Sequence, residues 1–408
     1  MKLPTAAPIY WNAAAATSWI ALFSLQFRSI LHLFGVFNPF QETILLAVGG
    51  AHLVLWTLLG SLYLSLSALR RVVVLWTALG ALAAALPSII GRTSLLVLSL
   101  YTPLMFFSAS FCVIPLISAA LDASSEERRA LDMALIFAAA CIINILVSTF
   151  MDAFPYTQSL LILALLRASV IPFALLLPKQ LLPSRREAER LPPRTTLIAI
   201  FGLLACFFLS DWLVHQALPL YYGVYIAKHI SIYRVTGIEV VAGIPAALIA
   251  GVLADRLGRK PIVASAIVLL GAAHMLEALN PMPVEVYAVI NGVCWGAIVV
   301  LLLTTIWGDY SFPRREVFLG LALSIYIVAN TLKVISVAST IRLPLQATFS
   351  FTGILMLFSL WFVAMMVEPL PERILEQRRL RSYIAKAKKI AEHYEKKGQS
   401  KVKRRELR

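Results

Sequence analysis

The sequence predicts an all-α membrane protein with transmembrane helices, and three observations lead to that prediction. Hydrophobic residues make up 60% of the 408 residues and charged residues only 14%, a composition typical of membrane proteins. The apolar residues form long continuous runs, which suit helices rather than the shorter, alternating strands of a membrane barrel. Lysine and arginine are concentrated in alternate loops between these runs.

Twelve runs are long enough to cross a bilayer, which takes about 20 apolar residues in a helix. They lie near residues 11–35, 42–66, 71–91, 95–120, 129–151, 158–178, 196–224, 234–254, 260–279, 284–307, 317–339 and 346–368. The first run is among the least uniform, because Gln26, Arg28 and His32 interrupt it.

The placement of lysine and arginine predicts how the chain is oriented. Loops after even-numbered segments are basic, whereas the opposite face carries only Arg92, Lys228, Arg234 and Arg342. The basic positions are Arg70, Arg71, Arg128, Arg129, Arg256, Arg259, Lys260, Arg314 and Arg315, with five more between 179 and 194 and fourteen after Val367. Because basic loops stay in the cytoplasm, we expect a multi-pass protein of the plasma membrane with both termini cytoplasmic.

A charged, proline-containing stretch at residues 179–195 divides the chain into halves of six segments each. Such a composition is typical of a linker. Residues 1–178 are expected to form one six-helix bundle and residues 196–368 a second, followed by a basic cytoplasmic tail at 369–408. The loops after segments two and eight are offset by about as many residues as segments one and seven, which predicts two parallel repeats.

The loop after segment eight carries the most specific motif in the chain. Residues 251–260 read Gly-Val-Leu-Ala-Asp-Arg-Leu-Gly-Arg-Lys between two apolar runs. Charges are costly in hydrocarbon, so a tight loop at the membrane surface is expected, and its glycines allow close backbone approach. The pattern resembles the loop signature of the major facilitator superfamily, matching it at Gly251, Asp255, Arg256, Gly258, Arg259 and Lys260. A basic hairpin between two unrelated helices is the alternative.

The resemblance implies a fold and a role for this loop. The fold is the major facilitator fold of two six-helix bundles. Asp255 is expected to dock on the N-terminal end of the fifth segment, close to Ala130, where a helix attracts anions, and to lock one conformation. The first-half copy departs from the pattern, because Leu64 stands at the aspartate position and Ser67 at the second glycine.

The sequence lacks the motifs that several classes of function require. The sequence has no phosphate-binding Gly-Lys-Ser/Thr loop, His-Glu-x-x-His motif or nucleophile elbow, so neither direct ATP use nor enzymatic catalysis is expected. Nucleic acid is not an expected partner, because the +15 net charge is unevenly placed along the chain. No metal or other cofactor is expected, since the cysteines lie in apolar runs without metal-ligand spacing. They are Cys112, Cys141, Cys206 and Cys294.

Ionisable groups inside the spans are the candidate functional residues, because a charge in hydrocarbon is costly. Arg28, Asp211 and Lys333 lie at similar depths in segments one, seven and eleven. Helical spacing places His215 on the face of Asp211, and Asn330 on the face of Lys333. By the family resemblance, Arg28 and Asp211 line the central cavity and Lys333 lies beside it.

These candidates also have structural interpretations. Lys333 could extend to the outer membrane surface, and Asp211 could form an internal ion pair that only joins helices. Asn291 could bind a solute or join helices by hydrogen bonds. Arg167 is expected to be structural, since segment six is peripheral in the superfamily.

The resulting hypothesis is a monomeric secondary transporter that moves a small polar or anionic organic solute by alternating access. Three intramembrane cations against one deep anion favour such a solute, and Asp211 is the candidate for proton coupling. The alternative is a non-transporting receptor or scaffold on the same fold, signalling through its tail. That tail has apolar residues at helical spacing, so it is either a solvated surface helix or an amphipathic helix on anionic lipid.

The orientation can be tested with single cysteines at Ser184 in the linker and Ser400 in the tail. If both regions are cytoplasmic, neither cysteine should react with a membrane-impermeant thiol reagent added to intact cells, and both should react once the membrane is permeabilised. Labelling of either position in intact cells would contradict the orientation.

Overall fold

The computed structural model describes residues 3–33, 39–63, 69–90, 95–178, 192–226, 232–310, 315–337 and 343–370, with single positions between 374 and 392. These residues form helices and, within the described ranges, no strand, as the sequence predicts. Eleven helical segments in the described part are long and apolar enough to cross a membrane. Residues 11–33 of the segment predicted at 11–35 are helical, within α1, but this helix is not among those eleven.

The described residues of the first half form eight helices. They are α1 (Leu3–Leu33), α2 (Pro39–Tyr63), α3 (Leu69–Ile90), α4 (Leu95–Ser110), α5 (Val113–Ala123), α6 (Arg129–Ala153), α7 (Tyr156–Ala168) and α8 (Ile171–Leu175). The fourth predicted segment is therefore divided between α4 and α5. Pro115 in the first turn of α5 has no N–H to bond the carbonyl of Phe111, which ends the regular ladder there. That carbonyl lies against Gly60 of α2, where a side chain would collide with it.

The described residues from 192 to 370 form the helices of the second half. They are α9 (Arg194–Ile226), α10 (Ile232–Leu257), α11 (Arg259–Leu279), α12 (Val284–Ile298), the π-helical turn η1 (Val299–Thr305), α13 (Ile306–Asp309), α14 (Arg315–Val337) and α15 (Leu345–Met365). The tenth predicted segment thus contains a π-helical stretch, a wider turn often found at functional sites.

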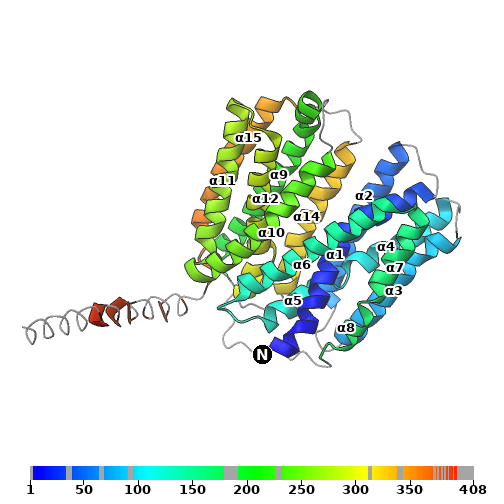
Figure 1. Ribbon diagram of the computed structural model, residues 1–408, viewed down its shortest axis with the longest axis horizontal. Helices are drawn as coiled ribbons and strands as arrows, with labels where there is room; N and C mark the ends of the chain where they lie inside the picture. Colours follow the sequence, from blue (N-terminus) through cyan, green and yellow to red (C-terminus); the bar gives the residue numbers. More distant parts are fainter. Residues whose placement is uncertain are drawn as a thin grey trace, which may run out of the picture.

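The helices of the two halves form two bundles side by side, with α1–α8 to the right and α9–α15 to the left in Figure 1. The bundles meet where α6 packs on α10 and where α2 packs on α14. The end of the molecule that carries the N-terminus also carries the α5–α6 and α10–α11 turns. Because these turns hold Arg128, Arg129, Arg256, Arg259 and Lys260, we call it the basic end.

Small residues bring the helices of the second bundle into close contact. Gly292 of α12 packs on the backbone of Glu239 in α10, and one turn later Gly296 packs on Gly243. A methyl group at Gly292 or Gly296 would collide with a carbonyl of α10. Close packing of this kind joins membrane helices where apolar burial cannot, and it fixes the two helices that carry Glu239 and Asn291.

Candidate functional site

Asp255, in the last turn of α10, contacts the first turn of α6. Its carboxylate accepts hydrogen bonds from the backbone N–H groups of Ala130 (3.1 Å) and Leu131 (2.9 Å). These N–H groups lack partners within the helix and lie at the positive end of its dipole. One turn earlier, Gly251 leaves room for α6, since a Cβ there would lie 2.9 Å from the carbonyl oxygen of Ala130. The contact expected for Asp255 is therefore present.

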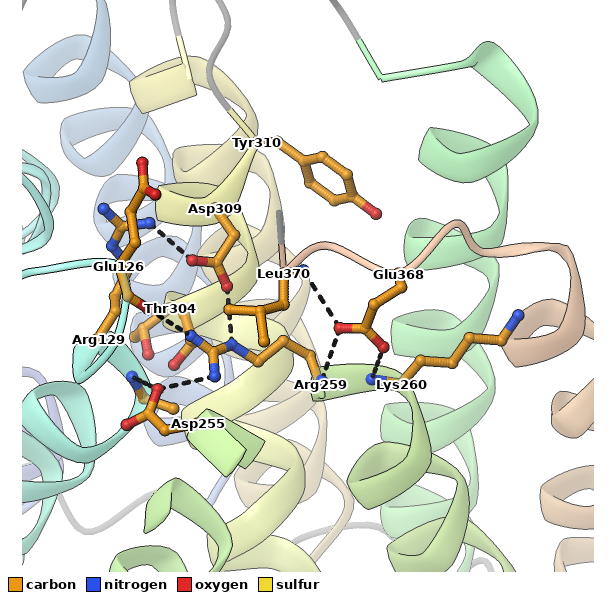
Figure 2. Close-up of polar contacts among 12 residues, drawn as sticks. Glu126, Arg129, Asp255, Arg259, Lys260, Thr304, Asp309, Tyr310, Glu368 and Leu370 are labelled. Carbon is orange, nitrogen blue, oxygen red and sulfur yellow. Dashed lines mark hydrogen bonds and ion pairs between the residues drawn. The ribbon is translucent and has the colours of Figure 1, made fainter. Parts of the chain in front are cut away.

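Arg259 extends the contact into a buried ionic cluster with Asp255, Asp309 and Arg129. Arg259 Nη1 lies 2.7 Å from Asp255 Oδ1, and its Nε donates to Asp309 Oδ2 at 2.8 Å. Arg129 Nη1 donates to the other oxygen of Asp309 at 2.6 Å. Figure 2 shows these side chains converging between helices of both bundles. Two arginines and two aspartates alternate, so the cluster combines burial with overall neutrality.

A second carboxylate, Glu368, caps the N-terminus of α11 at the same place. It accepts the backbone N–H of Arg259 at 2.7 Å and that of Lys260 at 3.0 Å (Figure 2). Gly258 precedes this turn with φ of 108°, a left-handed conformation that favours glycine. Lys260 donates its ammonium to the carbonyls of Ala364 (2.9 Å) and Met366 (2.8 Å). The turn is thereby fixed to the C-terminal end of α15.

The six motif residues differ in how deeply they are buried. Gly251, Asp255, Gly258 and Arg259 are buried at the contact, Lys260 is partly buried, and Arg256 is exposed. The sequence analysis did not single out Asp309 or Glu368. Each acidic residue directly follows an apolar run, which is the only sequence signal that could have pointed to it.

Another ionic contact joins the bundles at the start of α14. Arg315 pairs with Asp122 of α5 at 2.6 Å, and its Nη2 donates to the Ser118 carbonyl at 3.1 Å. Ser118 Oγ in turn donates to Glu316 at 2.7 Å. Leu64 and Ser67 of the degraded loop lie outside the described residues. The start of α14 is thus held to the first bundle by α5.

A polar layer lies deeper in the second bundle. Lys333 of α14 forms an ion pair with Asp211 of α9, and Asn291 of α12 donates to Glu239 of α10 at 3.0 Å. Asp211, Glu239 and Lys333 each lie about 25 Å along their helices from the basic end, at 1.5 Å per residue. His215 is close enough to Asp211 and Lys333 to interact electrostatically with both. We call Asp211, His215, Glu239, Asn291 and Lys333 the polar layer.

The structure separates the alternatives left open for these residues. Lys333 pairs with Asp211, so it does not extend to the membrane surface, and the internal ion pair considered for Asp211 is present. Asn330 donates to the carbonyl of Tyr326 one turn back in its own helix, at 2.9 Å. The side chain of Arg28 lies outside the described part.

Glu239 is the member of the polar layer that the sequence analysis missed. It stands at the edge of a segment that is otherwise apolar, and a carboxylate within a span is itself a signal of function. The count of one deep anion was therefore too low, because Glu239 is a second acidic residue at that depth. Asn291, proposed as a solute ligand or a link between helices, is bonded to it.

Arg167 of α7 has the structural environment expected for it. Its side chain is only 1% exposed, and the guanidinium carbon lies 4.9 Å from the ring centroid of Trp19 and 4.9 Å from that of Trp76. Gly80 of α3 leaves space for this group, since a Cβ there would collide with it. Cation–π contacts with two tryptophans hold the charge in the core of the first bundle.

Known proteins resemble this chain in structure but not in sequence. No protein-family model and no curated protein matches the sequence. The solved human organic anion transporter MFSD10 (TETRAN) matches with a TM-score of 0.65 and 16% identity, over 88% of this chain and 98% of that chain. The major facilitator superfamily proton:xylose symporter XylE, solved with 6-bromo-6-deoxy-D-glucose, matches with a TM-score of 0.61 and 13% identity, over 91% of this chain and 99% of that chain. At such identities the likeness establishes the fold.

The pairing of Asp211 with Lys333 predicts strong coupling between the two positions. Asp211→Asn leaves a lysine without its counter-charge inside the bundle, which should lower stability by about 2 kcal/mol, less than for a fully buried pair. Lys333→Gln in addition should recover at least about 0.5 kcal/mol. Thermal unfolding of the purified variants measures both effects. Additive losses would show that the pair contributes no mutual stabilisation.

Proposed function

We propose, from the premise that the chain has the major facilitator fold, that it is a secondary transporter for a small polar or anionic organic solute. Twelve crossings with both termini in the cytoplasm would complete the fold. The two bundles would rock about a central site and expose it to each side of the membrane in turn. The observation that carries this proposal is the buried ionic cluster that joins the bundles at one end.

An ionic seal suits a contact that must open and close. Two aspartates and two arginines that leave the cluster regain hydration, which offsets much of the attraction they lose. An apolar seal of the same size would instead expose hydrophobic surface to water when it opened. Asp255 makes the closed contact specific, because its carboxylate reaches the N–H groups at the α6 N-terminus only when the end of α10 lies against the start of α6. The cluster can therefore act as a gate with two stable states.

The described conformation is the one in which this gate is closed. With the orientation expected from the basic loops, the basic end faces the cytoplasm, so the cytoplasmic side is sealed. The Arg315–Asp122 pair adds a second closing contact on the same side. It replaces, in function, the aspartate that is missing from the first-half loop.

The polar layer is the proposed site of solute and proton coupling. Asp211 has a matched cation in Lys333, whereas the hydrogen-bond donor identified for Glu239 is the neutral amide of Asn291. A carboxyl group at this depth is most stable when it is protonated and neutral, or when it is ionised beside a counter-charge. We therefore assign proton coupling to Glu239 and a charge-holding role to Asp211, in place of the coupling role expected for Asp211 from the sequence.

The solute class follows from the donors and acceptors in the layer. Lys333, His215 and Asn291 supply groups that can bind oxygen atoms of a carboxylate or hydroxyl. A solute carboxylate could compete with Asp211 for Lys333, which would couple binding to rearrangement of the ion pair. The two structural neighbours are an organic anion transporter and a proton:xylose symporter, and both an organic anion and a sugar fall within this range of solutes.

A solute must be found before transport is measured. A screen of organic anions and sugars for thermal stabilisation of the purified protein identifies ligands that bind the folded state. Uptake of the ligand into proteoliposomes then distinguishes a transporter from the alternative, a receptor or scaffold that binds without transport. A stabilising ligand that never crosses the membrane would contradict the proposal.

Glu239→Gln should separate transport from proton coupling. The glutamine mimics the protonated acid, so solute counterflow should persist while accumulation driven by a pH gradient falls by at least about tenfold. Glu285→Gln, in the first turn of α12 and outside the polar layer, is the matched control. Full pH-driven accumulation in Glu239→Gln would remove this residue from the coupling mechanism.

Asp255→Asn should weaken the gate while leaving the protein folded. The amide cannot provide the negative charge that the α6 N-terminus and Arg259 require, so opening at the basic end becomes more frequent and transport slows. A cysteine at Thr304, partly buried beside the cluster, reports opening through its rate of thiol modification. Arg256→Gln is the control, because that side chain is exposed. Equal modification rates and full transport in Asp255→Asn would leave the loop as a connector.

A further inference from the structure

The described positions of the C-terminal tail beyond Ile374 are helical and are not buried against the bundles. Ile374 is 5% exposed, but each later described position, from Glu376 to Glu392, is exposed. In Figure 1 the red segments project away from α11, across rather than along the direction of the membrane-spanning helices. The described tail positions therefore extend across the direction of the spanning helices, beside the basic end.

The root of the tail is fixed to the second bundle. Leu370 is 2% exposed, and Glu368 caps α11 through the N–H groups of Arg259 and Lys260. These contacts hold Glu368 and Leu370, which precede the described tail positions, at the basic end beside the turn between α10 and α11. The position from which the helix extends is consequently set by the fold.

The described tail residues from Leu380 onward are amphipathic. Leu380, Tyr383, Ile384 and Ile390 are 57–68% exposed and follow the spacing that places them on one face of a helix. Ala387 and Ala391 fall on the same face. Lys386 and Lys388 stand at its edges, where their side chains can reach outward while the apolar face lies against a surface.

The charge of the tail complements an anionic surface. Residues 368–408 contain fourteen lysines and arginines against six glutamates. Clusters of basic residues next to a membrane-spanning helix are attracted to the negative lipids of the cytoplasmic leaflet. An apolar helix face with a basic polar face is the pattern of helices that lie in the membrane interface.

We propose that the tail helix binds the membrane surface, with Leu380, Tyr383, Ile384 and Ile390 inserted among anionic lipids and Lys386 and Lys388 at the headgroups. Three features carry this assignment: the unsupported apolar face, the excess positive charge and the direction in which the fold extends the helix. The bilayer is the one apolar surface that always lies beside this end of the molecule. The proposal does not depend on solute transport.

Hydrogen exchange of the full-length protein in single-protein nanodiscs tests the proposal. Nanodiscs of phosphatidylcholine alone are compared with nanodiscs that also contain phosphatidylglycerol. We expect the anionic lipid to slow amide exchange within residues 376–392 by about fivefold or more, the factor that one lysine near an anionic surface contributes. High salt should reverse the effect, because it screens exposed charges.

Two variants separate the apolar and the electrostatic contributions. Leu380→Gln with Ile384→Gln should abolish the lipid-dependent protection, and Lys386→Gln with Lys388→Gln should reduce it. Glu392→Gln, exposed and off the apolar face, should retain it. Equal exchange in both kinds of nanodisc would overturn the proposal in favour of a solvated helix. Protection that appears only when another protein is added would overturn it in favour of a protein partner.

Discussion

The contact between the two bundles depends on one buried constraint, the neutrality of the ionic cluster at the basic end. Asp309 receives Arg129 from one bundle and Arg259 from the other, and Arg259 also holds Asp255. Loss of Asp309 would leave Arg129 buried without a counter-charge, and loss of any of the other three would leave the buried cluster with a net charge. Either change is more costly than loss of the whole cluster. The four residues therefore act as a unit that links α6, α10, α11 and α13.

Helix ends give this cluster its geometry. The N-terminus of α6 is satisfied by Asp255 and that of α11 by Glu368, so two carboxylates from other elements replace the local caps that a soluble helix would use. Gly251 allows α10 to approach the start of α6 closely, and Gly258, in a left-handed conformation, allows the turn between α10 and α11. The loop motif therefore contributes through the close packing of its glycines as well as through its charges.

Among the described residues, the charges deep in the two bundles are held in different ways. In the first, Arg167 is held between tryptophan rings in the helix core. In the second, Lys333 is paired with Asp211, and Glu239 is bonded to Asn291 at the same depth. Ion pairs and acid–amide contacts can exchange partners with a solute or a proton, whereas a charge packed between aromatic rings has fewer alternatives. This asymmetry places the proposed chemistry in the second bundle.

The sequence by itself determined the helical membrane class and most segment positions, and the docking of Asp255 was implied by the resemblance of its loop to a family signature. Continuous apolar runs and a charged ten-residue turn are local patterns that one reading of the chain reveals. Only the tertiary structure decided that Lys333 pairs with Asp211, that Asp309 joins two arginines and that Glu239 belongs to the polar layer. These partners are 50 to 180 residues apart along the chain. Which helix faces meet depends on packing between helices. The spacing of residues within a single segment does not specify which other helix its polar face will contact.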